Sequence, residues 1–218
     1  MRSFMNNDIC FNIKMGDKES EQFTMTWFYR AMACTSNIDT NSPQYGERHI
    51  DLADRFISLW ICYNSILRES HGERLNDKQL IDAAGKDKDW EEILQRKMGE
   101  LCYYLNELMK YTVKDMKSGN SITLNSKEFE KLIQVIYQIR CNLFHGRKLP
   151  YEDKNSIDFK LIKLAHLILA PLVTEYLKSK DLVKIEYCQD YGNVADSDFP
   201  KPVLEIEDFE GGFIFEFR

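Results

Sequence analysis

The sequence predicts a mainly α-helical fold, an up-and-down bundle of four or five helices that is followed by a small β element. Between residues 51 and 178, apolar side chains recur every three or four residues in several segments that short polar loops separate. This spacing places them on one face of a helix, and short loops favour antiparallel neighbours. Beyond residue 181, apolar and polar residues alternate instead, as in strands with one buried face.

Three segments are expected within one domain: an N-terminal leader with short elements over 1–50, the helical bundle over 51–180, and an acidic β-hairpin or small sheet over 181–218. A chain of 218 residues is long enough for one full core and too short for two comfortable ones. Residues 1–22 are predicted as a polar leader. Residues 23–33 form either a short helix or a strand, and the polar stretch 34–49 is predicted as a loop.

The first strong helix is predicted over 51–69, where Phe56, Leu59, Trp60 and Tyr63 belong to an apolar stripe wide enough for burial on more than one side. The same spacing predicts three further helices. The first is short and covers 76–84, with Asn76 and Gln79 as its cap. The second is long and covers 89–117, and the third covers 158–178 and begins at Ser156 or Asp158.

The helix predicted over 126–145 carries the most informative motif. Asn125 is its predicted N-cap with Glu128 three residues later, and Gly146 ends it. Its apolar residues are Phe129, Leu132, Ile133, Ile136, Ile139 and Leu143. After 181, strands are predicted over 182–187, 203–207 and 213–217.

Charge is distributed unevenly. The formal net charge is −6, and residues 184–218 hold nine acids against three bases, so the rest of the chain is neutral. This balance argues against a protein that coats nucleic acid through a broad basic surface. A local basic site around Arg140, Arg147, Lys148 and Lys154 remains compatible with it. The acidic segment either covers one end of the bundle or, beside that basic site, restrains access to it or recognises a partner.

A cytoplasmic protein without a membrane segment is expected. The N-terminal residues lack the apolar stretch of a signal peptide, and the longest apolar run, 164–173, is too short to cross a bilayer. Six cysteines show no C-x-x-C pair and no nearby histidine at a zinc spacing. We therefore expect free thiols, no metal and no cofactor; no phosphate-binding glycine loop or nucleophile elbow is present.

Arg140 and His145 lie five residues apart at the end of the motif helix. Arg140 falls on or beside the apolar stripe, where a cation requires a specific partner or an oligomer interface. His145 lies in the last turn, where the helix dipole favours an imidazolium, and Asn142 is close enough to orient its ring. An arginine that holds phosphoryl oxygens and a histidine that moves protons can perform phosphodiester chemistry. A salt-bridged arginine and a capping histidine are the structural alternative.

Two segments together carry a family resemblance. The earlier helix reads F-x-x-L-W-x-x-Y-N from Phe56 to Asn64, and the later one reads R-C-N-L-F-H-G from Arg140 to Gly146. In this order they resemble the HEPN family of small helical domains, over about residues 50 to 178. The basic pair after Gly146 also fits. The chain departs from the family pattern at Cys141, which follows the arginine and stands where active members usually carry a polar residue.

The resemblance implies a metal-independent endoribonuclease in which Arg140 and His145 of two protomers meet at a homodimer interface. Asn142 would then orient the histidine, and Arg147 and Lys148 would bind RNA. The expected product is a 2′,3′-cyclic phosphate, and RNA is the expected substrate because DNA lacks the attacking hydroxyl. Relatives are often toxins or phage-defence effectors, which makes an antitoxin protein a further expected partner. Many relatives lack activity, so a non-catalytic RNA-binding, nucleotide-binding or assembly protein is the alternative.

Overall fold

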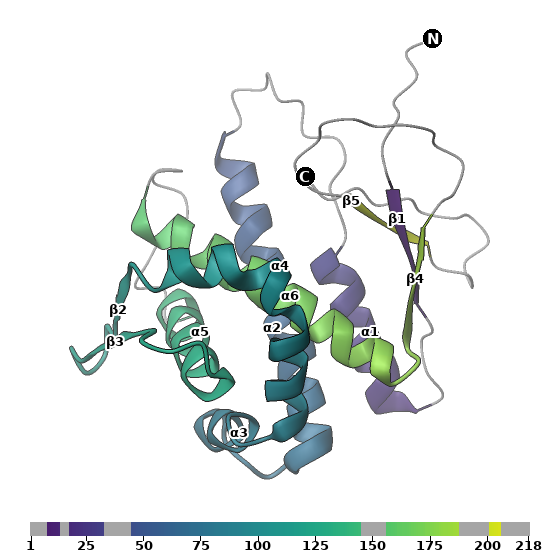
Figure 1. Cartoon of the computed structure of the whole chain (residues 1–218), viewed down its shortest axis with the longest axis horizontal. Coiled ribbons are helices and arrows are strands. Elements are labelled where there is room, and N and C mark those ends of the chain that lie inside the picture. The colour runs from purple at the N-terminus through teal and green to yellow at the C-terminus, as the bar shows by residue number, and fades with distance from the viewer. Residues whose placement is uncertain (1–7, 14–17, 33–44, 145–155, 188–200, 206–218) are drawn as a thin grey trace.

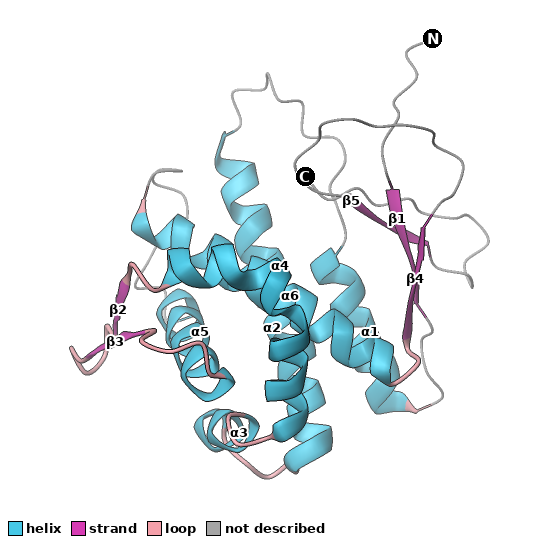
Figure 2. Ribbon diagram, in the orientation of Figure 1, coloured by secondary structure: helices cyan, strands magenta, loops and turns pink. Residues whose placement is uncertain are grey.

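The computed structural model describes residues 8–13, 18–32, 45–144, 156–187 and 201–205. These residues form six helices: α1 (Glu19–Met32), α2 (Tyr45–His71), α3 (Asp77–Ala84), α4 (Lys88–Leu108), α5 (Phe129–Phe144) and α6 (Ile157–Ser179). They also form five short strands: β1 (Asp8–Ile13), β2 (Thr112–Lys114), β3 (Ser121–Thr123), β4 (Val183–Tyr187) and β5 (Lys201–Glu205). The predicted mainly α fold with a small β element is confirmed (Figure 2).

Helix α2 is the centre of the packing. Helices α1, α3 and α6 all contact it, α4 packs against α6, and α5 contacts α3, α4 and α6 (Figure 1). The apolar residues of the α2 stripe are almost completely buried: Phe56, Leu59, Trp60, Cys62, Tyr63, Ile66 and Leu67. The predicted burial of this helix on more than one side is therefore confirmed, and it follows from the three neighbours that need its surface.

Aromatic stacking joins four helices where α5 begins. The Trp90 ring of α4 is stacked with Phe129 of α5 and with Tyr176 of α6, with ring centroids 5.6 Å and 4.7 Å apart. Tyr63 of α2 meets the same indole edge-on at 5.1 Å. Buried aromatic pairs of this kind contribute about 0.5–1.5 kcal/mol each beyond their buried area. The first residue of the motif helix is thereby held in the core.

The start of α5 corrects the prediction. Asn125 is not its N-cap, because the helix begins at Phe129 and the carbonyl of Glu128 accepts the Leu132 N–H. The Phe129 N–H donates instead to Glu91 Oε2 of α4, at 2.8 Å. A carboxylate from another helix thus satisfies a free N–H of the first turn. The helix is described as far as Phe144, and its predicted end at 145 and 146 lies outside the described residues.

The prediction of one helix over 89–117 was wrong. Helix α4 ends at Leu108, and strands β2 and β3 then form an antiparallel hairpin in which Thr112 pairs with Thr123 and Val113 with Ile122. Val113 is buried at 2% exposure. Gly119 takes a φ of +78° in the connecting turn, a conformation that glycine adopts without strain. This hairpin packs against α5, and its loop forms one side of the site described below.

Two of the predicted C-terminal strands are present, but the sheet also contains a strand from near the N-terminus. β4 and β5 do not pair with each other; both pair with β1, which is antiparallel to β4 and parallel to β5. Residues 8–13, predicted as part of a polar leader, therefore form the central strand, and the predicted segment boundary at residue 50 falls within α2. Strand β4 of this sheet contacts α6, and the sheet lies away from the β2–β3 hairpin (Figure 1). The predicted strand over 213–217 lies outside the described residues.

Candidate functional site

The last turns of α5 carry two of the predicted catalytic residues. Arg140 and Asn142 lie in the helix, which ends at Phe144. His145, Arg147 and Lys148 lie outside the described residues, so the approach of His145 to Arg140 stays a prediction. The site is built here from Arg140 outward.

Arg140 lies half-buried among acidic and aromatic neighbours. Its Nη2 is 3.2 Å from Asp77 Oδ2, at the first residue of α3, and its side chain is 18% exposed. The guanidinium carbon stands 4.2 Å from the centroid of the Phe144 ring and 5.8 Å from that of Trp60. Arginine combines such ring contacts with an ion pair because its guanidinium is flat and weakly hydrated. The sequence argument that this cation needs a specific partner is confirmed, and the partner is Asp77.

Asp77 also binds a second arginine. Its Oδ1 accepts from Arg68 Nη2 at 3.1 Å, while Asn64 Oδ1 accepts from Arg68 Nε at 2.8 Å. The remaining Arg68 nitrogen, Nη1, donates to the carbonyls of Glu73 and Leu75, at 3.0 Å and 3.1 Å. One carboxylate therefore lies between two guanidinium groups, and the cluster keeps an excess positive charge next to the end of α5.

Some of the hydrogen-bonding capacity of Arg140 is left unused by the described residues. Nε is buried and has no hydrogen-bond partner among them. Among the described residues, Nη1 reaches only the Cys141 sulfur, a weak acceptor, at 4.0 Å. A buried donor without a partner costs about 1–3 kcal/mol, so such groups are uncommon and often functional.

Asn142 connects α5 to the β2–β3 hairpin through hydrogen bonds. It is 6% exposed, its Nδ2 donates to the Lys114 carbonyl at 2.8 Å, and its Oδ1 accepts from the Met116 N–H at 3.3 Å and from Gln138 Nε2 at 3.1 Å. The side chain therefore fixes the β2–β3 loop against α5. Its predicted role in orienting His145 stays a prediction, because His145 is not among the described residues.

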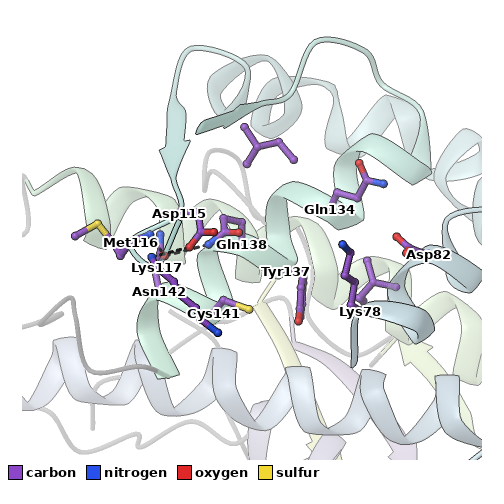
Figure 3. A pocket seen from close by; sticks show the side chains of 12 residues that line it. Lys78, Asp82, Asp115, Met116, Lys117, Gln134, Tyr137, Gln138, Cys141 and Asn142 are labelled. Atoms are coloured by element: carbon purple, nitrogen blue, oxygen red, sulfur yellow. Dashed lines mark hydrogen bonds between the residues drawn. The ribbon is translucent and has the colours of Figure 1, made fainter. Parts of the chain in front are cut away.

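A pocket of about 410 Å³ opens directly beside this turn of α5 (Figure 3). α3 provides Lys78 and Asp82 on one side, and the hairpin loop provides Asp115, Met116 and Lys117 on the other. Tyr137, Gln138 and Cys141 of α5 lie between the two sides. A volume of this size falls in the range of small-molecule sites, about 300–1,000 Å³.

Two titratable groups of the pocket have shifted pKa values. Burial, and secondarily a hydrogen bond with Cys141, raises the pKa of Tyr137 to about 12, so its phenol stays neutral. Hydrogen bonds from the Ser118 hydroxyl and the Lys117 N–H lower the pKa of Asp115. Asp115 is thus a carboxylate that the loop itself satisfies, since Lys117 N lies 2.8 Å from Oδ1.

Sequence reasoning found Arg140 and missed Asp77 and the pocket. Asp77 is remote from the motif, and only the fold brings it there. The hairpin does have a local sequence signal, since β-forming residues at 112–113 and 121–123 flank a Ser-Gly-Asn turn.

Within the described residues, no group of three or more histidine, cysteine or acidic side chains could hold a metal ion. The same residues contain no helix that is both long and apolar enough to cross a membrane. Cys62, Cys102 and Cys141 are free thiols, of which Cys62 is buried.

Comparison of the chain with protein-family models, with curated proteins and with solved structures finds no match.

Proposed function

We propose that this protein is a metal-independent endoribonuclease of the HEPN type, with Arg140 and His145 as its catalytic residues. It acts as a homodimer in the cytoplasm and leaves 2′,3′-cyclic phosphate ends. Arg147 and Lys148 bind RNA beside the scissile phosphate.

The proposal is supported by one observation: side chains from both of the segments that resemble the HEPN family lie together around Arg140. Trp60 and Asn64 come from the earlier segment: the Trp60 ring faces the guanidinium, and Asn64 binds Arg68, which shares Asp77 with Arg140. Residues about 80 positions apart in the chain thus cooperate to place one cation at the end of α5. A cation fixed in position is what phosphoryl transfer requires of its electrostatic stabiliser.

In the proposed reaction the ribose 2′-oxygen attacks the adjacent phosphorus, and the bond from phosphorus to the 5′-oxygen breaks. The 2′-hydroxyl loses its proton and the leaving 5′-oxygen gains one. His145 moves these protons, a contribution of about 10²–10⁴ in rate. Arg140 stabilises the charge that develops on the phosphoryl oxygens.

The family resemblance implies the homodimer, and the exposure of one aromatic ring supports it. Phe144, the last residue of α5, is 42% exposed although it covers the Arg140 guanidinium. A second protomer that packs on this face would bury that ring and bring two Arg140/His145 pairs together. A role as a toxin or phage-defence effector with an antitoxin partner rests on the family resemblance alone.

A non-catalytic binding or assembly protein is the second candidate, and the ion pair of Arg140 with Asp77 favours it. In that case Arg140 serves the packing of α3 on α5, and any RNA or nucleotide is held without being cut.

The deciding experiment incubates the purified protein with labelled total RNA and tRNA in EDTA and scores cyclic-phosphate ends. We expect cleavage by the wild type and its loss, by at least about 10²-fold, in Arg140→Ala and His145→Ala. Arg96→Ala removes an exposed arginine of α4 and serves as the matched control. Circular dichroism and light scattering check the fold and dimerisation of each variant. A folded wild-type dimer that leaves RNA intact would establish the second candidate.

A further inference from the structure

The pocket between α3, the β2–β3 loop and α5 contains polar groups that the fold does not use. Lys78, Asp82, Gln134 and Lys117 line it, and their side chains make no hydrogen bond or ion pair with the described residues. By contrast, Gln138, Asn142 and Asp115 on the same lining are hydrogen-bonded to one another or to the loop backbone. The pocket therefore has a rigid frame and a separate set of free donors and acceptors.

Its remaining surface suits a flat, partly apolar ring. The phenol of Tyr137 lies between the α3 side and the hairpin side of the pocket (Figure 3). Met116, Ile81 and Ile122 add apolar lining. Aromatic side chains bind unstacked bases of single-stranded nucleic acid by stacking, with about 1–3 kcal/mol per base. Gln134 and Asp82 offer an amide and a carboxylate that can hydrogen-bond the edge of such a base.

Charge is placed to accept the phosphate groups of the same ligand. Lys78 and Lys117 are exposed lysines on opposite sides of the pocket. Two acids line the pocket: Asp115 accepts hydrogen bonds from the Lys117 backbone N–H and the Ser118 hydroxyl, and Asp82 forms no ion pair with either lysine. The side-chain ammonium groups of both lysines are therefore free to bind the phosphates on either side of a bound nucleoside.

The pocket adjoins the proposed catalytic arginine. Cys141 lines it, and the Sγ of Cys141 lies 4.0 Å from Arg140 Nη1. Tyr137, which also lines the pocket, is near Arg140 as well, because the Trp60 ring contacts both side chains. A ligand in the pocket therefore lies next to any phosphate that Arg140 holds.

From these observations we infer that the pocket is a nucleotide subsite, which takes one unstacked base of a single-stranded RNA next to the scissile phosphate. Tyr137 stacks on the base, Gln134 and Asp82 contact its edge, and Lys78 and Lys117 hold the flanking phosphates. The inference deepens the proposed function and rests on it for the identity of the RNA as substrate.

Binding of a fluorescein-labelled, single-stranded 2′-O-methyl RNA to the full-length protein tests the inference, because this probe cannot be cleaved by a 2′-hydroxyl mechanism. Tyr137→Leu removes the stacking ring and keeps an apolar side chain, and we expect about tenfold weaker binding. Lys78→Ala and Lys117→Ala should each weaken binding about threefold and lower its salt dependence. Lys163→Ala removes an exposed lysine of α6 outside the pocket, and binding should stay unchanged.

A second measurement locates the ligand. Alkylation of Cys141 by iodoacetamide is followed by peptide mass spectrometry, with the half-buried Cys102 of α4 as the internal control. We expect the RNA to slow the reaction at Cys141 and not at Cys102, and nucleoside monophosphates to do so at higher concentration. Protection by monophosphates without protection by RNA would assign the pocket to a free nucleotide, and equal protection by inorganic phosphate would remove the base from it; either result overturns the inference.

Failure of the inference is distinguishable from failure of the proposed function. RNA cleavage together with unchanged binding by Tyr137→Leu, Lys78→Ala and Lys117→Ala overturns the subsite and leaves the nuclease in place. Loss of binding in these variants, with no cleavage by the wild type, keeps the subsite and makes the protein a binder of single-stranded RNA.

Discussion

Asp77 carries one negative charge between two guanidinium groups, those of Arg68 and Arg140. Its side chain is 29% exposed, so water screens both ion pairs, and each contributes only about 0–1 kcal/mol to stability. Its larger effect is on geometry. Without Asp77, Arg140 keeps its ring contacts with Trp60 and Phe144 but loses the bond that sets the direction of its guanidinium.

Asp77→Asn tests this positioning role, since it removes the charge and keeps the size of the side chain. We expect RNA cleavage to fall by about 10- to 100-fold, because a shift of about 1 Å in a catalytic group has effects of that order. The free energy of unfolding, measured with urea, should fall by only about 1 kcal/mol. The two assays together separate a displaced arginine from an unfolded protein.

Asp89→Asn is the matched control for this variant. Asp89 is exposed and lies in the first turn of α4, as Asp77 lies in the first turn of α3. Both substitutions remove a carboxylate that interacts favourably with a helix N-terminus, worth about 0.3–1 kcal/mol, but only one of them touches Arg140. Unchanged or faster cleavage by Asp77→Asn would show that the ion pair restrains Arg140 without serving catalysis.

The approach of α3 to α5 determines where the pocket walls stand. Gly85 caps the C-terminus of α3, and a Cβ atom added there would lie 3.0 Å from Cγ and 3.1 Å from Cα of Glu130, in the first turn of α5. The second atom belongs to the backbone and cannot move aside. Glycine at this position therefore allows the two helices to touch.

Gly85→Ala should lower the free energy of unfolding by about 1–3 kcal/mol, because the helices must separate to admit the methyl group. Gly99→Ala is its counterpart. Gly99 lies inside α4 with no atom within 4 Å of an added Cβ, so alanine should raise the free energy of unfolding by about 0.5–1 kcal/mol. Urea denaturation of both variants measures the two opposite signs. Stabilisation by both would mean that α3 moves away from α5 without cost.

The elements that sequence could predict are those with local signals. The capping box of Asn76 and Gln79 appears as predicted, and of the two predicted starts of α6, Ser156 and Asp158, the structure has Ser156 as the N-cap. Helix α4 was extended too far because Leu105, Leu108 and Thr112 continue the helical spacing past its real end. The place of β1 between β4 and β5 depends on pairing across most of the chain, which no local pattern encodes.

The residues of the candidate site also divide into those that have a local sequence signal and those that do not. Arg140 was found because its residue type conflicts with the apolar stripe on which it lies. Asp77 and Lys78 come from another helix and Asp115 to Lys117 from a loop that was predicted as helix. Tertiary structure alone places these residues around one pocket.

At the scale of the whole molecule, the position of His166 couples stability to pH. His166 lies in α6, which contacts α2, α4 and α5, and it is 6% exposed. Its Nδ1 is buried without a hydrogen-bond partner among the described residues. Burial, and secondarily the charge of Arg55, lowers its pKa to about 4.

This histidine should make the fold weaker in mild acid. An unfolded histidine has a pKa of about 6.5, so between about pH 6.5 and pH 4 the unfolded chain binds a proton at His166 that the folded chain does not. The free energy of unfolding therefore falls as the pH is lowered through this window, by at most about 1.4 kcal/mol per pH unit and about 3 kcal/mol in all. Urea denaturation at several pH values between 4.5 and 7 measures the slope.

His166→Leu isolates this contribution, because leucine does not titrate. The substitution also breaks no hydrogen bond at Nδ1, since that atom has no partner among the described residues. The variant should unfold with nearly the same free energy at every pH above about 4.5, and at pH 5 it should be more stable than the wild type. Asp115 does not confuse the comparison, since its lowered pKa places its loss of stability below this range. A wild-type slope that survives in His166→Leu would assign the acid sensitivity to other groups and would mean that α6 admits water around His166 before the molecule unfolds.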